Sequence, residues 1–209
     1  INGNVFGGAK MAGIDGGTHV LLDGENATRD MFIKNVYGGN DVSGTVSGQA
    51  HVESLAASGD AVIMYVDNLY GGGNGDYDYT ASGDAQGLAA PDIASVRIDL
   101  KGGCFGQVFG GGNSATVTES TIIELNNTTA TLKDRDGESL DYQFSRVFGG
   151  NNKVAMAIRP TWNLIKGSVD NLYSGGNQGD MTHTNGILLA VTGADMTVNN
   201  MFGGCRMAD

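Results

Sequence analysis

Residues 68–72 read NLYGG, and this short pattern of Asn, aliphatic, aromatic and two Gly residues recurs along the whole chain. With small changes it occurs seven times, at 4–8, 35–39, 68–72, 107–111, 146–150, 171–175 and 200–204. Successive copies are 25 to 39 residues apart. Repetition at a period of about 20–50 residues is typical of solenoids, propellers and arrays. The variable period indicates that loops of different length are inserted between equivalent segments.

The third motif position is always Phe or Tyr, and the residue before it is always aliphatic or Met. We expect the aromatic residues of successive copies to stack in one column, facing either the core or an outer groove. The seven aromatic residues are Phe6, Tyr37, Tyr70, Phe109, Phe148, Tyr173 and Phe202.

The first motif position is Asn in five of the seven copies, including Asn35, Asn68, Asn171 and Asn200. Asn tolerates left-handed backbone and hydrogen-bonds its own main chain in turns, so we expect the chain to bend there. The Gly pair is expected to close a corner, where the backbone needs either a positive φ or close approach to a neighbour.

Apolar residues upstream of the motif alternate with a period of two, as at 62, 64 and 66, which is the periodicity of a strand. A second type of strand is predicted at 19–23, 95–100, 121–125 and 187–191. Two or three short strands per copy predict a parallel β-solenoid with equivalent residues about 4.8 Å apart. The shortest intervals leave too little chain for the four-stranded blades of a propeller.

The phrases VYGGND, LYGGGN, VFGGGN, VFGGNN and LYSGGN resemble the repeats of large surface proteins of gut bacteria. The layout is also similar to right-handed parallel β-helix proteins of the pectate-lyase-like class. The resemblance implies a right-handed parallel β-helix of about six to seven coils of roughly 30 residues, spanning 1–209 as a single domain. It implies an extracellular or cell-surface location, and we expect the chain to be a fragment of a longer repeat array.

Composition narrows the range of functions. The chain has 209 residues and a net charge of −11 without any basic cluster, so nucleic acid is not an expected partner. It has no apolar run long enough to predict membrane insertion. Its 35 Gly and 2 Pro residues exclude collagen and Pro-rich linkers. Cys104 and Cys205 are too few for a disulfide scaffold or a zinc site and are interpreted as small buried residues.

The stretch GGGNGDYDY at 71–79 is the most distinctive local feature. It resembles the calcium-binding nonapeptide of RTX proteins, but Tyr77 stands where that pattern has Asp, between Asp76 and Asp78. Calcium held by Asp76 and Asp78 is the only cofactor predicted, and solvated turn aspartates are the alternative. The surrounding loop, 74–92, is the least patterned part of the chain. Tyr77 and Tyr79, beside Asp76 and Asp78, could stack on a sugar and hydrogen-bond to it there.

No catalytic residue is predicted, although two enzymatic mechanisms have candidates. For a polysaccharide lyase they are Arg97, Lys101 and Arg159, which the sequence does not place on one face. For a hydrolase they are Asp99 and Glu124, in strands of neighbouring coils. The three histidines, His19, His51 and His183, are scattered and interpreted as surface or turn residues.

Together these features predict a non-enzymatic surface protein, an adhesin or spacer whose loops bind glycans or another surface. A carbohydrate-active enzyme with a groove along the β-helix is the alternative. A third hypothesis is end-to-end self-association, because the end strands of a solenoid leave backbone groups unpaired.

Overall fold

The computed structural model describes residues 1–57, 62–186, 188–189, 191 and 193–207, which form strands and no helix. The strands are β1 (Asn4–Phe6), β2 (Thr18–Asp23), β3 (Met31–Tyr37), β4 (Thr45–Leu55), β5 (Met64–Tyr70), β6 (Asp92–Leu100), β7 (Cys104–Phe109), β8 (Thr116–Asn126), β9 (Phe144–Phe148), β10 (Thr161–Tyr173) and β11 (Asp195–Phe202). The fold is all-β, as predicted. Within the described residues, nothing forms a helix that could cross a membrane.

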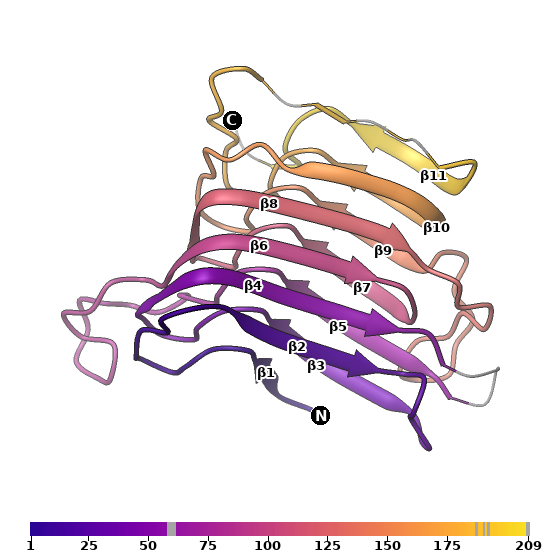
Figure 1. Cartoon of the computed structure of the whole chain (residues 1–209), viewed down its shortest axis with the longest axis horizontal. Helices are drawn as coiled ribbons and strands as arrows, with labels where there is room; N and C mark the ends of the chain where they lie inside the picture. The colour runs from indigo at the N-terminus through magenta and orange to yellow at the C-terminus, as the bar shows by residue number, and fades with distance from the viewer. Residues whose placement is uncertain (58–61, 187, 190, 192, 208–209) are drawn as a thin grey trace.

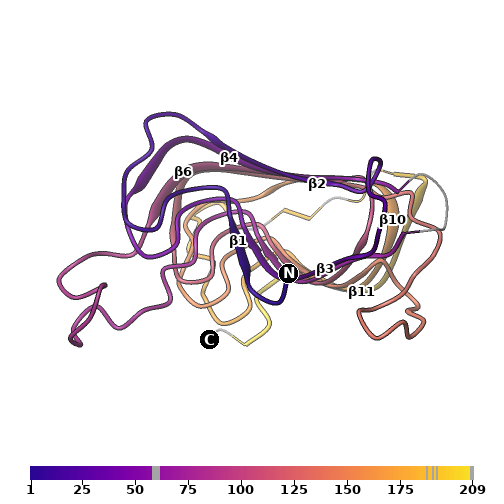
Figure 2. The same cartoon turned by 90° about the horizontal axis from the view of Figure 1, so that it is seen from below.

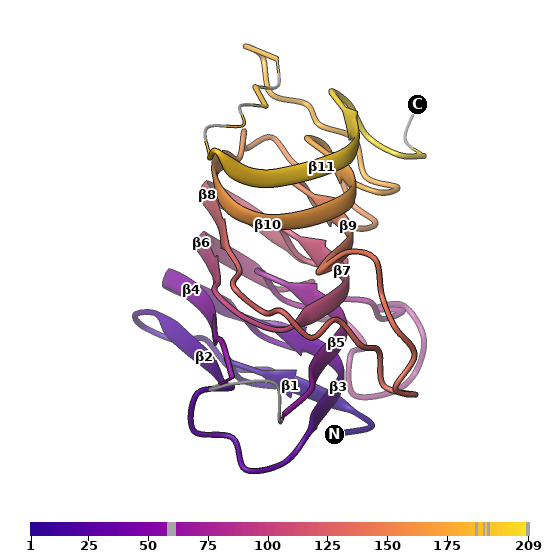
Figure 3. The same ribbon diagram turned by 90° about the vertical axis from the view of Figure 1, so that its right-hand side faces the viewer.

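All pairings between these strands are parallel and join one sheet in the order β1-β3-β5-β7-β9-β10-β8-β6-β4-β2, with β11 beside β10. The odd-numbered strands up to β9 and the even-numbered strands up to β8 lie on opposite walls, as Figures 1 and 2 show. The long strand β10 pairs with β8 through its first part and with β9 through its last part, which joins the two walls. Figure 3 shows β10 and β11 curving around one side of the molecule.

The repeated motif pairs with itself in register. Asn4, Val5 and Phe6 lie opposite Asn35, Val36 and Tyr37. The same alignment continues through the later copies to β10 and β11, where Tyr173 lies opposite Phe202. The predicted parallel stacking of equivalent residues is therefore confirmed.

The aromatic residues form a continuous column. Adjacent ring centroids are 4.6–4.9 Å apart and the ring planes differ by at most 11°. The five inner rings are at most 9% exposed and form a cluster separate from the main hydrophobic core, which combines residues of both walls. Alternation along each strand explains this, because the aliphatic residue before each aromatic points to the other face. The inner part of the column is thus buried, while Phe202 at its end is 42% exposed.

The motif asparagines have a different role from the one predicted. Asn35 and Asn68 lie inside β3 and β5, and among the described residues only glycines have positive φ. Their amides instead form a ladder, in which Asn35 Nδ2 donates to Asn4 Oδ1 at 2.8 Å and Asn68 Nδ2 donates to Asn35 Oδ1 at 2.9 Å. The motif asparagines therefore do not use a left-handed backbone, and an amide is favoured because it can donate to one neighbour and accept from the other. Ile33 and Val36, three positions apart, both face the core, so the period of two is broken at Asn35, as the predicted bend requires.

The motif glycines are required by close backbone approach. A Cβ on Gly38 would lie 2.2 Å from the carbonyl oxygen of Gly71, and one on Gly110 would lie 2.4 Å from that of Gly149. None of the glycines of the seven motifs has a positive φ. Of the two predicted reasons for the Gly pair, close approach is the correct one.

The second type of strand was predicted with mixed success. Residues 19–23, 95–100 and 121–125 lie in β2, β6 and β8. Residues 188, 189 and 191 are not in a strand, while 187 and 190 lie outside the described residues. The prediction missed β4, whose inward positions include the small residues Ala50 and Ser54 and whose pairing with β6 shifts register between Val46 and Gln49. The small inward residues and the register shift both obscure the alternation of apolar and polar residues by which a strand is recognised in a sequence.

We predict that Gly110→Ala lowers the free energy of unfolding by about 1–3 kcal/mol, because its Cβ would force the neighbouring backbone to move. Gly203→Ala is the matched control, since it occupies the same motif position with nothing within 4 Å. Urea unfolding followed by circular dichroism would measure both. Equal losses in the two variants would contradict the close-approach explanation.

Stability should fall in alkaline solution, because burial raises the pKa of Tyr70 to about 12. Above pH ~10 the unfolded chain releases this phenolic proton while the folded chain keeps it. Between pH ~10 and ~12 the residue therefore removes up to about 1.4 kcal/mol of stability per pH unit. Tyr70→Phe should flatten the decline in urea-unfolding free energy, and an unchanged slope would refute this assignment.

Candidate functional site

The predicted binding loop, 74–92, is fastened to the repeat before it. The Tyr77 hydroxyl donates to Asp41 Oδ1 at 2.7 Å, and the Tyr79 hydroxyl donates to the Val42 carbonyl at 2.6 Å. The two rings meet edge to face with centroids 6.5 Å apart. Burial, and then the hydrogen bond to Asp41, raise the pKa of Tyr77 to about 12. Both tyrosines hold the loop, and Tyr77 is still 41% exposed.

The predicted calcium ligands have protein partners. Asp76 Oδ2 lies 2.5 Å from Lys153 Nζ. Asp78 Oδ1 accepts from the Thr80 hydroxyl and from the backbone N–H groups of Thr80 and Ala81, which together hold the pKa of Asp78 below its usual value. Asp78 thus closes a local turn, while Asp76 anchors the loop to a later repeat. The calcium site stays a prediction.

A ladder of amides supports the base of this loop. Asn74 Nδ2 donates to Asp41 Oδ1 at 2.9 Å, and Asn113 Nδ2 donates to Asn74 Oδ1 at 3.0 Å. Asn152 and Asn177 continue the ladder, each four residues after its motif aromatic. In the sequence this ladder is indicated by the final Asn of phrases such as LYGGGN, for which no role was predicted. Asp41 therefore receives hydrogen bonds from both the ladder and Tyr77.

A hollow of about 360 Å³ opens between this loop and the first repeats. It is lined by Lys10, Val42, Tyr77, Asp78 and residues 81–85. An ion pair between Lys10 Nζ and Asp84 Oδ2, 2.8 Å long, crosses from the first repeat to the loop. The volume is near the lower end of ligand pockets, which span roughly 300–1,000 Å³. The lining combines an aromatic ring, a cation and two carboxylates, which suits a small, polar, hydroxyl-rich ligand.

The opposite wall carries a second candidate site, which we name the charged cluster. It consists of seven side chains from β2, β4, β6 and β8 and the residue after β6: His19, His51, Glu53, Arg97, Asp99, Lys101 and Glu124. The strand register explains why these side chains lie together. The basic residues are successive pairing partners, namely His19, His51 and Arg97. The carboxylates Glu53, Asp99 and Glu124 are also successive partners, two positions further along.

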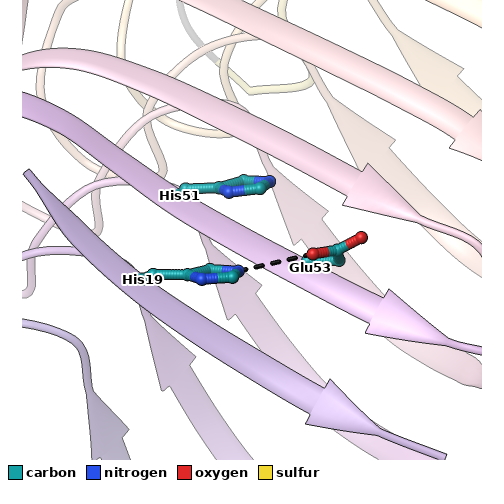
Figure 4. Close-up of side chains that lie close together, drawn as sticks. All are labelled: His19, His51 and Glu53. Atoms are coloured by element: carbon teal, nitrogen blue, oxygen red, sulfur yellow. Dashed lines mark ion pairs between the residues drawn. The ribbon is translucent and has the colours of Figure 1, made fainter.

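Each of the three stacked bases contacts a carboxylate of the next strand. His19 Nε2 lies 3.4 Å from Glu53 Oε2, and His51 Nε2 lies 2.7 Å from Asp99 Oδ2. Arg97 Nη2 lies 3.6 Å from Glu124 Oε2. The two imidazole rings stack with centroids 4.5 Å apart, and Figure 4 shows them parallel with the Glu53 carboxylate beside them.

Asp99 is the buried centre of the charged cluster, with a side chain only 7% exposed. Its Oδ2 also accepts from Arg97 Nε at 2.7 Å, while its Oδ1 has no hydrogen-bond partner among the described residues. Lys101 Nζ lies 2.6 Å from Glu53 Oε1, and this contact lowers the pKa of Glu53. The hydrogen bond to Asp99 similarly raises the pKa of Arg97.

The charged cluster changes one interpretation made from the sequence. His19 and His51 are stacked in register and not scattered, although His183 is remote and contacts the backbone of Asn185. A signal existed in the His-Val pairs at 19–20 and 51–52, which mark equivalent positions.

The sequence did not place the lyase candidates on one face. Arg97 and Lys101 both belong to the charged cluster, whereas Arg159 lines a separate hollow with Trp162. The hydrolase candidates Asp99 and Glu124 are pairing partners on neighbouring strands, and Arg97 contacts both.

The cysteines take no part in either site. Cys104 is buried, which raises its thiol pKa to about 11, and Cys205 is half-buried; both are free thiols.

No protein-family model, curated protein or solved structure matches the chain. The function of the chain is therefore inferred from its two candidate sites, the hollow beside loop 74–92 and the charged cluster.

We predict that Arg97→Met lowers the free energy of unfolding by about 3 kcal/mol, because it leaves the buried Asp99 carboxylate without its cation. Lys153→Met is the matched control, since it breaks a half-exposed ion pair with Asp76 and should cost less than about 1 kcal/mol. Thermal and urea unfolding would measure both. Similar losses would show that burial of Asp99 does not determine the effect.

Proposed function

We propose that the chain is a right-handed parallel β-helix with coils of roughly 30 residues that serves as an extracellular display scaffold. The parallel pairing of equivalent residues in successive repeats supports this proposal. Its function is to hold loops in fixed positions on a stiff support, as adhesins and surface spacers do. In this proposal affinity resides in the loops, and the stacked repeats provide rigidity.

The proposed ligand is a glycan, bound in the hollow beside loop 74–92. The observation that carries this proposal is the pre-ordered lining: Tyr77 is tied to Asp41, and Lys10 is tied to Asp84 across the opening. A binding site ordered in advance loses less conformational entropy when the ligand binds. The exposed face of Tyr77 offers a stacking surface for a sugar ring, and Lys10, Asp78 and Asp84 offer hydrogen bonds to its hydroxyls.

A glycan panel tests this function, with retention of the protein measured in calcium and in chelator. We expect retention that falls at least about tenfold in Tyr77→Ala, since an aromatic contact in a binding site carries a large share of affinity. Tyr77→Phe keeps the ring but loses the hydrogen bond to Asp41, so retention should fall less than in Tyr77→Ala. Tyr142→Ala, which changes an aromatic residue elsewhere on the surface, is the control.

Absence of retention on every glycan, or equal loss in Tyr77→Ala and Tyr142→Ala, would refute glycan binding at this hollow. A loss of retention in chelator would support the calcium prediction for Asp76 and Asp78. Retention unchanged by chelator would count against it.

The second candidate is a carbohydrate-active enzyme acting on the wall formed by β4, β6 and β8. It is favoured by one observation, the carboxylates of Asp99 and Glu124 at paired positions on adjacent strands. Paired strand positions are separated by about 4.8 Å, close to the roughly 5–5.5 Å between the carboxyl groups of retaining glycosidases. The same glycan panel distinguishes this candidate, because an enzyme would release new sugar ends and Glu124→Gln would abolish that release.

A further inference from the structure

The charged cluster brings together three side chains whose donor atoms suit a transition-metal ion. His19 and His51 are pairing partners on β2 and β4, and Glu53 is two residues beyond His51 on the same face of β4. One donor atom from each of the three lies within 4.8 Å of the other two. Figure 4 shows the two rings one above the other with the carboxylate directed toward their edges. We propose that His19, His51 and Glu53 bind a divalent transition-metal ion, with Zn²⁺ the best match.

The geometry needs only small side-chain movements to accommodate this ion. Zinc–nitrogen bonds of about 2.0–2.1 Å place two ligands of a tetrahedral site roughly 3.3 Å apart. His19 Nε2 and Glu53 Oε2 are already 3.4 Å apart. The stacked rings, with centroids 4.5 Å apart, must tilt so that their nitrogens approach by about 1 Å. The proposal requires this rotation about side-chain bonds, with the paired strands left in place.

The charge balance of the charged cluster favours an added cation. Three carboxylates, from Glu53, Asp99 and Glu124, face two permanent cations, Arg97 and Lys101. Lys101 occupies Glu53 Oε1, which leaves Oε2 directed at His19. The whole chain has a net charge of −11, so a divalent cation is also attracted at long range.

Asp99 provides an independent indication. Its side chain is more than nine-tenths buried, and its Oδ1 has no hydrogen-bond partner among the described residues. A buried carboxylate oxygen without a partner is costly. Asp99 Oδ2 lies 2.7 Å from His51 Nε2. Carboxylates orient metal-bound histidines through the ring nitrogen that does not bind the ion, so this contact leaves Nδ1 of His51 for the metal. Asp99 is therefore a positioning residue for His51, and its charge adds to the attraction for the ion.

The donor set determines which ion fits. Neutral imidazole binds Zn²⁺, Cu²⁺ and Ni²⁺ well, whereas Ca²⁺ prefers an all-oxygen shell of six to eight ligands. The site offers two imidazoles and one carboxylate, the ligand types of many zinc sites with an open coordination position. This site is distinct from the calcium site predicted at Asp76 and Asp78.

Zinc titration of the intact chain at pH 7.5, in competition with a chromophoric chelator, tests the proposal. We expect one Zn²⁺ per chain and at least a tenfold weaker affinity in His19→Ala and in His51→Ala. His183→Ala is the matched control, because it removes the third histidine of the chain and should leave the affinity unchanged. Ca²⁺ at the same concentration should not displace the zinc.

A second measurement on the unaltered chain keeps the test valid if a variant folds poorly. Zn²⁺ should shift the imidazole NMR signals of His19 and His51 and leave those of His183 in place. No zinc binding, affinity unchanged in both cluster variants, or shifts that include His183 equally would each overturn the proposal.

Discussion

In-register parallel pairing between successive repeats is the constraint on which this structure depends. It places each side chain of the motif directly against the equivalent side chains of the neighbouring repeats. A residue type can therefore recur at one position only where it packs well against a second copy of itself. Phe and Tyr do so with centroids 4.6–4.9 Å apart. Asn does so because its amide both donates and accepts, as Asn68 and Asn35 show. The same approach of neighbouring backbones excludes a Cβ at Gly38 and Gly110.

Charged residues that stack in this way destabilise the sheet unless they are compensated, because like charges at neighbouring positions repel. The charged cluster avoids the difficulty by using two adjacent columns, one basic and one acidic, so that each base contacts an acid of the next strand. Its columns also mix residue types, with His19 and His51 followed by Arg97 in one and Glu53 followed by Asp99 in the other. Departures from an otherwise uniform pattern are where function is expected, since the scaffold alone does not require them.

The two candidate sites use the scaffold in different ways. The hollow beside loop 74–92 depends on an insertion between strands, fastened by Tyr77 and Tyr79 to groups of the preceding repeat. The charged cluster lies on the strands themselves, where the spacing between side chains is set by backbone hydrogen bonds. The residues of the loop site can therefore change without disturbing the core. The side chains of the charged cluster are held in place by the paired strands that carry them.

The sequence by itself determined the parallel stacking, because seven copies of one motif leave few other ways to bury the same aliphatic residue each time. It also identified Tyr77, Tyr79, Asp76 and Asp78 as a distinctive loop, although not that their polar atoms mostly serve the loop itself. It did not reveal which way the aromatic column faces, since both faces of a strand carry apolar residues here.

Only the tertiary structure decided which distant residues meet. His51 lies 48 residues from Asp99, and Lys101 lies 48 residues from Glu53. These pairs depend on loop lengths that differ between repeats, and on register shifts such as those between Val46 and Gln49 and between Ile93 and Ser95. A single shifted residue moves a side chain to the opposite face of a strand. The motif therefore determined the ladder of strands, and strand register determined the charged cluster.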